Sequence, residues 1–455
     1  MTDGEPLLSV RNLKKHYPIT EGILSREVGR VRAVDGISFD IARGETLGLV
    51  GESGCGKSTA ASSIIQLEEP TEGEVIFNSE KYDPVTDPDA DPHPNDVTEF
   101  DDRQLKEFRR QAQMIYQDPS SSFDPRMTIG ESVAEPLRVH GLDDKERRRA
   151  IVQDLLERVG LSADDYHRYP HEFSGGQKQR VGLARALVLN PELIIADEPV
   201  SALDVSVQAE VLSLMNDIKE EFGLSMLFIS HDLGVVREVC DRVAVMYLGE
   251  IVELGPTEQL FEDPQHPYTQ ALLSSIPVPD PRQRGMGVEL SGDVPSPSDP
   301  PSGCRFHTRC PKVIQPEGYD FEQEHWRSVM DLRERVGKRS IDVDAVREYV
   351  VAERDGEIDE EAVTTDQMDA VIREEFDVPD PLPDADAEAV LAEALEYVAR
   401  GDFESADDLL STEFETVCET RKPTYTETRP GHKASCLLHE TEAGDEFERS
   451  ASLSD

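Results

Sequence analysis

The sequence predicts an α/β fold built on a parallel sheet, followed by a smaller C-terminal module. Three observations lead to this prediction. A glycine-rich segment at 51–59, which matches a phosphate-binding loop, stands between an apolar run and a helical pattern. Short apolar runs at 193–197 and 225–230 are bounded by turn residues, as is typical of buried parallel strands. A stretch rich in Pro, Ser, Asp and Gly at 276–303 then marks a linker.

The elements of the first part alternate as an α/β domain requires. Residues 7–80 contain short alternating apolar and polar runs separated by glycine turns, which predict β-strands. The run ETLGLV at 45–50 predicts a buried strand, and a helix is expected from about 57 to 67. Residues 103–190 show a mostly helical pattern. Strands that alternate with helices predict a sheet covered by helices.

The chain carries a strong negative charge. It has 94 Asp and Glu residues against 46 Lys and Arg residues, for a net charge of −48. Such a polyanion lacks the basic footprint that binds nucleic acid, so no nucleic-acid partner is expected. Dense like charge repels itself at low salt, but at molar salt the Debye length falls to ~3 Å and the repulsion is screened. This leads to the hypothesis of a high-salt cytoplasm, as in a halophile.

Nothing in the sequence indicates export or a membrane span. The first ten residues, MTDGEPLLSV, have neither a basic region nor a long apolar stretch. No apolar run approaches the roughly 18 residues of a membrane helix. The six scattered cysteines do not fit a secreted disulfide scaffold. The chain is therefore expected in the cytosol, with reduced thiols.

The segment GESGCGKST at 51–59 has the residue types that bind the phosphates of a nucleotide. Glycines let backbone N–H groups face the phosphates, and the following helix N-terminus adds its dipole. Lys57 would reach the β- and γ-phosphates, and Ser58 would ligate Mg²⁺. Cys55 stands at a variable position and is interpreted as a small spacer. The ATP-binding residues predicted in this loop are Gly51, Ser53, Gly54, Gly56, Lys57, Ser58 and Thr59.

An acidic pair follows the apolar run at 193–197. Asp197 ends this run, where its carboxylate can hold Mg²⁺ through water. Glu198 comes next and would act as the general base toward an attacking water. An acidic pair after a strand is weak evidence alone, so the interpretation depends on its combination with the phosphate loop.

The order of these motifs resembles that of the ATP-binding subunits of ABC transporters. The segment FSGGQKQR at 173–180 is similar to the family signature, and Gln117 in YQDPSSS matches the Q-loop. SALD at 201–204 matches the D-loop, and ISHD places His231 at the switch histidine. The resemblance covers residues 7–255. It implies an ABC-type P-loop ATPase with a RecA-like α/β core, an antiparallel β subdomain and a helical subdomain.

The resemblance also implies roles for individual residues. Glu198, His231 and Gln117 would form the catalytic set, and Gln117 would also contact Mg²⁺. Tyr17 would stack on adenine, although an ordinary core aromatic is the alternative. The signature residues of one subunit would contact the γ-phosphate held by another, so that two ATP molecules lie between two such domains. The residues implied at this shared site are Ser174, Gly175, Gly176, Gln177 and Asp204.

Beyond residue 255 the chain resembles one subfamily, the oligopeptide and dipeptide importers. The segments HPYTQALLSSIP at 266–277 and GCRFHTRCP at 303–311 are similar to its C-terminal motifs. Cys418 and Cys436 follow where two more cysteines would be expected. The chain departs from the subfamily through a long acidic stretch of helical pattern at about 313–415, which looks like an insertion without an assigned function.

Four tail cysteines could form one site, and relatives in this subfamily imply a [4Fe–4S] cluster there. Soft thiolates favour an Fe–S cluster or zinc. The C-x₅-C spacing is not the C-x₂-C of common zinc sites, so reduced thiols without metal are the alternative. His307 and His432 are interpreted as polar surface residues rather than ligands, and Cys240 as a core residue. The four cysteines are Cys304, Cys310, Cys418 and Cys436.

Four parts are expected along the chain. Residues 1–265 would form the nucleotide-binding domain, and residues 266–312 would begin the C-terminal module with its Pro-rich linker. Residues 313–415 would be the acidic helical insertion, and residues 416–455 would complete the module and end in an acidic tail. One cassette cannot complete the shared ATP site, so a second ATP-binding chain is expected.

These observations predict the ATPase subunit of a membrane importer for oligopeptides or dipeptides. The implied partners are two transmembrane permeases, a paralogous ATP-binding subunit and an extracellular solute-binding protein, with this chain at the cytoplasmic face of the membrane. The same subfamily handles nickel and some sugars, and this subunit does not touch the solute. One rival is a soluble ABC ATPase of repair or translation, which would carry coiled-coil arms or a second cassette. The other is an iron- or redox-responsive regulator that uses the tail cysteines.

Overall fold

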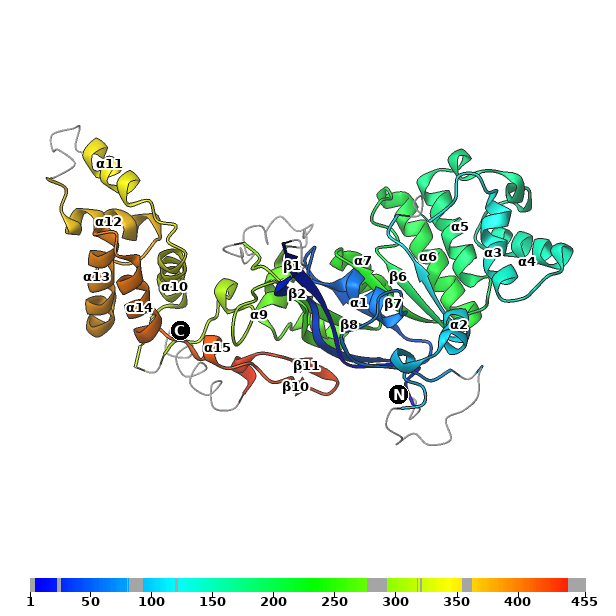
Figure 1. The fold of residues 1–455 in the computed structure, drawn as a ribbon, viewed down its shortest axis with the longest axis horizontal. Helices are drawn as coiled ribbons and strands as arrows, with labels where there is room; N and C mark the ends of the chain where they lie inside the picture. Colours follow the sequence, from blue (N-terminus) through cyan, green and yellow to red (C-terminus); the bar gives the residue numbers. More distant parts are fainter. Residues whose placement is uncertain are drawn as a thin grey trace. The chain divides into compact units, whose positions relative to one another are not determined.

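The computed structural model places the chain in two compact units (Figure 1). It describes residues 5–22, 26–79, 81, 93–118, 122–275, 293–316, 318–319, 321–353 and 362–440. The first unit takes its residues from 1–264, 296–299 and 429–433, and the second from 265–295, 300–428 and 434–455. Most of the expected linker and the whole acidic tail after residue 440 lie outside the described residues. Within the described residues, every helix is too short or too polar to cross a bilayer.

A three-stranded antiparallel sheet begins the first unit, as the alternating pattern predicts. Its order is β2–β1–β4, made of β1 (Leu8–Glu21), β2 (Arg26–Ile41) and β4 (Glu72–Phe77). Apolar side chains such as Leu8, Val10 and Val75 are buried, so one face of this sheet packs on the core of the unit.

A larger sheet forms the centre of the first unit. Its strands run in the order β9–β8–β3–β7–β6–β5, and all of these are parallel except β9. Every residue of β3, β6 and β7 is buried, as expected for strands covered on both faces. The strands predicted at 193–197 and 225–230 are confirmed. The strands are β3 (Thr46–Val50), β5 (Ala112–Ile115), β6 (Leu193–Asp197), β7 (Ser225–Ser230), β8 (Arg242–Tyr247) and β9 (Glu250–Pro256).

The helices of the first unit follow the predicted pattern with two differences. Helix α1 ends three residues earlier than expected, because the chain leaves helical geometry at Ile65 and Gln66 takes a φ of 57°. Strand β5 lies inside the region expected to be mostly helical, directly after α2 and without a turn residue to signal it. Helices α3, α4 and α5 pack together (Figure 1). The helices are α1 (Lys57–Ile64), α2 (Asp102–Gln111), α3 (Ile129–Val139), α4 (Lys145–Arg158), α5 (Gly175–Leu187), α6 (Val205–Phe222), α7 (Leu233–Val239) and α8 (Thr257–Glu262).

The second unit is mainly helical, and the helices expected in the acidic insertion are present. Trp326 of α10 is fully buried, where its ring stacks on Phe321 and meets Phe414 edge-on. Arg333 donates to the carbonyl of Phe414 at 2.9 Å and to Glu419 at 2.8 Å, so α10 is tied to the segment that carries Cys418. The helices are α9 (Pro267–Ser274), α10 (Gln323–Gly337), α11 (Val343–Glu353), α12 (Thr365–Glu375), α13 (Ala385–Ala399), α14 (Phe403–Glu413) and α15 (Val417–Thr420).

Two histidines interpreted as surface residues are in fact buried. His432 begins β11 (His432–Ala434), which follows β10 (Thr426–Arg429) and pairs with β9. Its Nε2 lies 2.7 Å from Oε1 of Glu253, and neither side chain is exposed. A Cβ on Gly255 would stand 2.7 Å from Cδ2 of His432, so glycine is needed beside the ring. His307 is 6% exposed and its Nδ1 lies 2.8 Å from the carbonyl of Cys304. The surface interpretation is wrong because each ring has a polar partner inside the fold.

The core position predicted for Cys240 is confirmed. Its side chain is buried, and a Cβ placed on Gly48 of β3 would lie 2.9 Å from its Sγ atom. The thiol therefore fills the space that a glycine leaves on the sheet. Burial raises the pKa of Cys240, which keeps this thiol neutral.

Candidate nucleotide site

The phosphate loop joins the end of β3 to the start of α1 and contains three glycines with positive φ. Gly51 has a φ of 151° and Gly56 a φ of 110°. A Cβ on Gly51 would lie 2.1 Å from the carbonyl oxygen of Met246, and a Cβ on Gly56 would lie 1.9 Å from that of Ala33. Gly54, with a φ of 82°, has no atom within 4 Å of such a Cβ. Only backbone conformation favours glycine at Gly54, whereas space excludes a side chain at the other two.

Lys57 is the first residue of α1 and is held inside the loop. Its Nζ donates to the carbonyls of Gly51 at 2.8 Å and Glu52 at 3.0 Å, and its side chain is buried. The N-cap of α1, Gly56, offers no capping side chain to the first N–H groups of the helix. These donors and the ammonium group are therefore suited to an anion. Cys55 is also buried, and burial raises the pKa of its thiol, in agreement with the spacer interpretation.

Two of the three predicted protein ligands of Mg²⁺, Ser58 and Asp197, meet beside the loop. Ser58 Oγ donates to Oδ1 of Asp197 at 3.1 Å. Asp197 ends β6, and α1 starts after β3, with β7 between the two strands. Burial raises the pKa of Asp197, while the hydrogen bond from Ser58 acts in the opposite direction. A hydroxyl and a carboxylate are oxygen donors of the kind that Mg²⁺ prefers, so these residues fit the ion.

The three predicted catalytic residues come together at the ends of neighbouring strands. Glu198 Oε2 accepts a hydrogen bond from Nε2 of Gln117 at 2.7 Å, and its Oε1 lies 3.0 Å from Nδ1 of His231. Gln117 follows β5, Glu198 follows β6 and His231 follows β7, which are adjacent in the sheet. Glu198 has a φ of 45°, and its N–H donates to the carbonyl of Ile229 at 2.9 Å. An uncommon backbone conformation thus aims the carboxylate at its two partners.

Tyr17 lies on β1 close to the phosphate-loop helix. Its side chain is half-buried, and its hydroxyl donates to the carboxylate of Glu68. Burial and Glu68 raise the pKa of Tyr17, while a hydrogen bond with Thr59 acts to lower it. Lys15 Nζ lies 5.1 Å from the centre of the ring. No sequence motif indicated Glu68, which lies beyond the end of α1.

The signature segment is organised around the start of α5. Ser174 caps this helix: its Oγ accepts from the N–H of Gln177 at 3.4 Å, and the Gln177 side chain accepts from the N–H of Ser174 at 3.0 Å. A Cβ on Gly176 would lie 2.3 Å from Cγ1 of Val207, so this glycine lets α5 approach α6. Gly175 precedes it in the first turn. Among the described residues, no hydrogen bond or ion pair links Ser174 or Gln177 to the phosphate loop.

Asp204 of the predicted D-loop caps the next helix. Its Oδ1 accepts from Oγ of Ser206 at 2.7 Å and from the N–H of Val207 at 3.1 Å, and the bond from Ser206 is the main cause of its lowered pKa. The neighbouring Val205 is 83% exposed.

Comparison with known proteins identifies the family. The model described as "ABC transporter" matches residues 34–201, and "Oligopeptide/dipeptide transporter, C-terminal region" matches residues 252–316. The oligopeptide transport ATP-binding protein AppF of Bacillus subtilis is 52% identical over 312 residues, which cover 68% of this chain and 90% of that protein. The chain belongs to the ATP-binding subunits of ABC transporters, in the oligopeptide/dipeptide group. The predicted ABC-type P-loop ATPase fold is thereby confirmed.

A second relative agrees with the assignment of this ABC ATPase. A putative peptide import ATP-binding protein of Brucella ovis is 51% identical over 309 residues, covering 68% of this chain and 90% of that protein. A solved dimeric structure of a bacterial ABC transporter cassette matches with 29% identity and a TM-score of 0.47, covering 55% of this chain and 98% of that one. Residues 323–431 match a model described as a domain of unknown function, which includes most of the expected insertion.

The four tail cysteines of this ABC ATPase line one small cavity in the second unit, and no disulfide joins them. The N–H of Cys304 donates to the carbonyl of Cys418 at 2.8 Å, and the N–H of Lys312 donates to Sγ of Cys310 at 3.4 Å. Burial raises the pKa of Cys310 and of Cys418, so both thiols are neutral. No group of three or more His, Cys, Asp or Glu side chains in the described ranges is arranged to hold a metal ion. The structure therefore brings the four cysteines together around one cavity.

Proposed function

We propose that this subunit energises the import of oligopeptides or dipeptides through ATP-driven closure of two nucleotide-binding domains. The observation that carries the proposal is the meeting of Glu198, Gln117 and His231 at the edge of the sheet, beside a phosphate loop in which Gly51 and Gly56 leave no room for a Cβ. The peptide part rests on the relatives named as oligopeptide transport and peptide import proteins.

The residues of the loop and of the acidic pair have separate tasks in this proposal. Lys57 would exchange its bonds to two loop carbonyls for bonds to phosphate oxygens, which carry more negative charge. Ser58, Asp197 and Gln117 would hold Mg²⁺, which offsets the charge on the phosphates. Glu198 would take a proton from the attacking water, and His231 and Gln117 would orient its carboxylate.

A second ATP-binding chain is needed to complete each site. The signature residues Ser174 and Gln177 are fixed by each other rather than by this chain's phosphate loop. Together with Gly175, Gly176 and Asp204 they would act on ATP held by a paralogous subunit, in a heterodimer. Two transmembrane permeases would receive the closing motion at the cytoplasmic face of the membrane, and an extracellular binding protein would deliver the solute. Tyr17 would stack on the adenine of this chain's own ATP.

Substitution of the proposed base tests this assignment. Glu198→Gln keeps the size and the hydrogen-bonding ability of the side chain but removes the carboxylate that accepts the proton. We expect ATP binding to persist and the rate of ATP hydrolysis to fall by about 10²–10⁴-fold, the usual range for loss of a general base. Phosphate release by the purified subunit with its partner chain measures the rate, and gel filtration with ATP should show an accumulated dimer.

A matched substitution on the surface controls for effects on the fold. Glu220 lies exposed on α6 and has no hydrogen bond or ion pair within the described part of the chain. Glu220→Gln makes the same chemical change and should leave hydrolysis within about twofold of the unaltered chain. A Glu198→Gln protein that hydrolyses ATP at the normal rate would show that another group is the base.

A [4Fe–4S] cluster or zinc ion at the four tail cysteines is a separate proposal. The position of the four cysteines around one cavity supports a metal site. Against it, no group of three or more possible ligands among the described residues is arranged to hold a metal ion. We expect the double substitution Cys304→Ser, Cys310→Ser to lower the iron or zinc bound per chain, because two of four soft ligands are lost. Elemental analysis after anaerobic purification measures this. Cys240→Ser, in the core of the other unit, is the control, and equal metal content in all three proteins would rule the site out.

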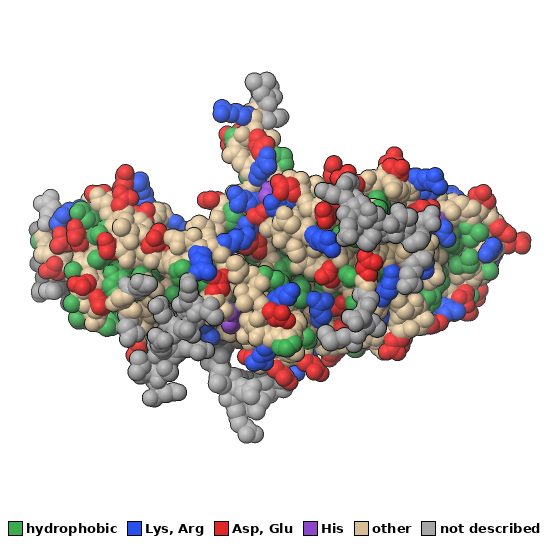
Figure 2. Space-filling model, turned by 90° about the horizontal axis from the view of Figure 1, so that it is seen from below, with side chains coloured by type: hydrophobic (Ala, Val, Ile, Leu, Met, Phe, Trp, Pro, Cys, Tyr) green, Lys and Arg blue, Asp and Glu red, His purple; other side chains and the backbone are tan. Residues whose placement is uncertain are grey.

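Adaptation to high salt is the third proposal. Figure 2 shows Asp and Glu side chains spread over the face in view rather than confined to one end. With a net charge of −48, mutual repulsion should weaken the folded state until salt screens it. We therefore expect the urea midpoint of unfolding to rise as KCl increases from low to molar concentration. A midpoint that does not change with KCl would contradict adaptation to high salt.

A further inference from the structure

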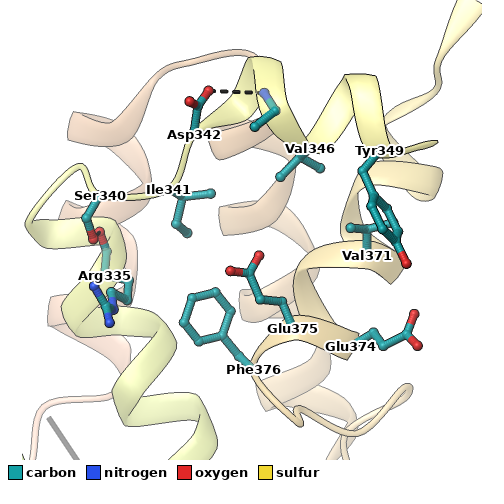
Figure 3. A pocket seen from close by; sticks show the side chains of 11 residues that line it. Arg335, Ser340, Ile341, Asp342, Val346, Tyr349, Val371, Glu374, Glu375 and Phe376 are labelled. Carbon is teal, nitrogen blue, oxygen red and sulfur yellow. Dashed lines mark hydrogen bonds between the residues drawn. The ribbon is translucent and has the colours of Figure 1, made fainter. Parts of the chain in front are cut away.

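The second unit contains a cavity of about 750 Å³ that no residue of the nucleotide site lines. It lies among the end of α10, the start of α11 and the end of α12, as Figure 3 shows. Its volume falls within the ~300–1,000 Å³ of pockets that bind small molecules. The cavity lies within residues 323–431, which match the domain of unknown function.

One part of the cavity is apolar. Ile341 and Val346 are buried side chains, and Val371 and Phe376 are half-buried. Tyr349 adds an aromatic ring that is 54% exposed, at one edge. This wall would bury a hydrocarbon side chain of a ligand, and covering it would remove apolar surface from water.

Opposite charges stand on two different helices at the edge of the same cavity. Arg335 comes from α10 and Glu375 from α12, and both side chains are exposed. Neither forms a hydrogen bond or ion pair with another side chain in the described ranges. On the same helix, by contrast, Arg327 pairs with Asp331 and Arg333 pairs with Glu419. Figure 3 shows Arg335 on one side of the Phe376 ring and the Glu375 carboxylate on the other.

Two other polar side chains of the cavity already have partners. The Asp342 carboxylate accepts from the N–H groups of Asp344 at 3.2 Å and Ala345 at 3.1 Å, so it caps the start of α11. The Ser340 hydroxyl donates to the carbonyl of Arg335 at 3.2 Å. The polar groups left to recognise a ligand are therefore the Arg335 guanidinium, the carboxylates of Glu374 and Glu375 and the Tyr349 hydroxyl, around an apolar wall.

We propose that this cavity binds a small zwitterion with an apolar side chain, namely a short peptide or a free amino acid. The ligand carboxylate would pair with Arg335, whose planar guanidinium suits bidentate contact. The ligand ammonium group would pair with Glu375, and its side chain would lie against Ile341, Val346 and Phe376. A simple anion or a simple cation would leave one of the two charges without a partner. The binding reaction concerns the second unit alone and does not depend on the solute that the transporter moves.

Calorimetric titration of the full chain with the dipeptide phenylalanyl-leucine tests the proposal. The control probe is the same dipeptide with its amino end acetylated and its carboxyl end amidated, which keeps the side chains and removes both charges. We expect the uncapped dipeptide to bind at least about tenfold more tightly than the capped one, because each charged hydrogen bond contributes about that factor. Free leucine and phenylalanine, titrated in the same way, show whether a peptide or an amino acid is the preferred form.

Substitutions at the two charges locate the site. Arg335→Gln and Glu375→Gln should each weaken dipeptide binding by about tenfold or more. Glu374→Gln is the matched control, since this neighbour also lines the cavity but its carboxylate points away from the Phe376 ring in Figure 3. It should change the affinity by less than about twofold. Ala345→Phe should abolish binding by filling the cavity without removing a charge, and thermal unfolding will show that each variant is folded.

Three results would overturn the proposal. The first is the absence of measurable heat with the dipeptide and with both amino acids at millimolar concentration. The second is equal affinity for the capped and uncapped dipeptides. The third is an unchanged affinity in both Arg335→Gln and Glu375→Gln. Tighter binding of a free amino acid than of the dipeptide would support the zwitterion site and identify amino acids as its ligands.

Discussion

The contact between the phosphate loop and two backbone carbonyls constrains the whole nucleotide site. Gly51 lies against the carbonyl of Met246 in β8, and Gly56 lies against that of Ala33 in β2. These contacts hold the loop between the antiparallel sheet and the central sheet, because backbone atoms on each side cannot give way. Lys57 and the first turn of α1 are therefore aimed by the two sheets together. The anion-binding geometry is a consequence of packing as much as of a local motif.

The order of the central sheet determines which distant residues can cooperate. Gln117, Glu198 and His231 follow the adjacent strands β5, β6 and β7, and Ser58 meets Asp197 across β7. Parallel strands end at one edge of a sheet, which is where ligands of α/β proteins bind. Under the proposed function, the same arrangement would let Asp197 be largely buried and still hold a cation, since burial raises its pKa and a bound cation would favour the ionised form.

Much of this site could be predicted because its signals are local. The runs at 193–197 and 225–230 are continuous apolar strands, and the glycine-rich loop has a fixed spacing. Features that depend on distant partners were missed. His432 is buried beside Glu253, which lies 179 positions away in the sequence. No residue close to His432 in the sequence indicates this burial. Strand β5 is four residues long and has no turn before it. The cavity in the second unit needs side chains from three helices, so no single segment indicates it.

We infer that this subunit works as part of a peptide importer rather than as an independent ATPase. Affinity purification from detergent-solubilised native membranes in high salt, with identification of the bound proteins, tests it most directly. We expect two polytopic permeases and a paralogous ATP-binding subunit, together with a solute-binding protein that binds peptides. Recovery of the chain only from the soluble fraction, in association with ribosomal or DNA-repair proteins, would contradict the claim.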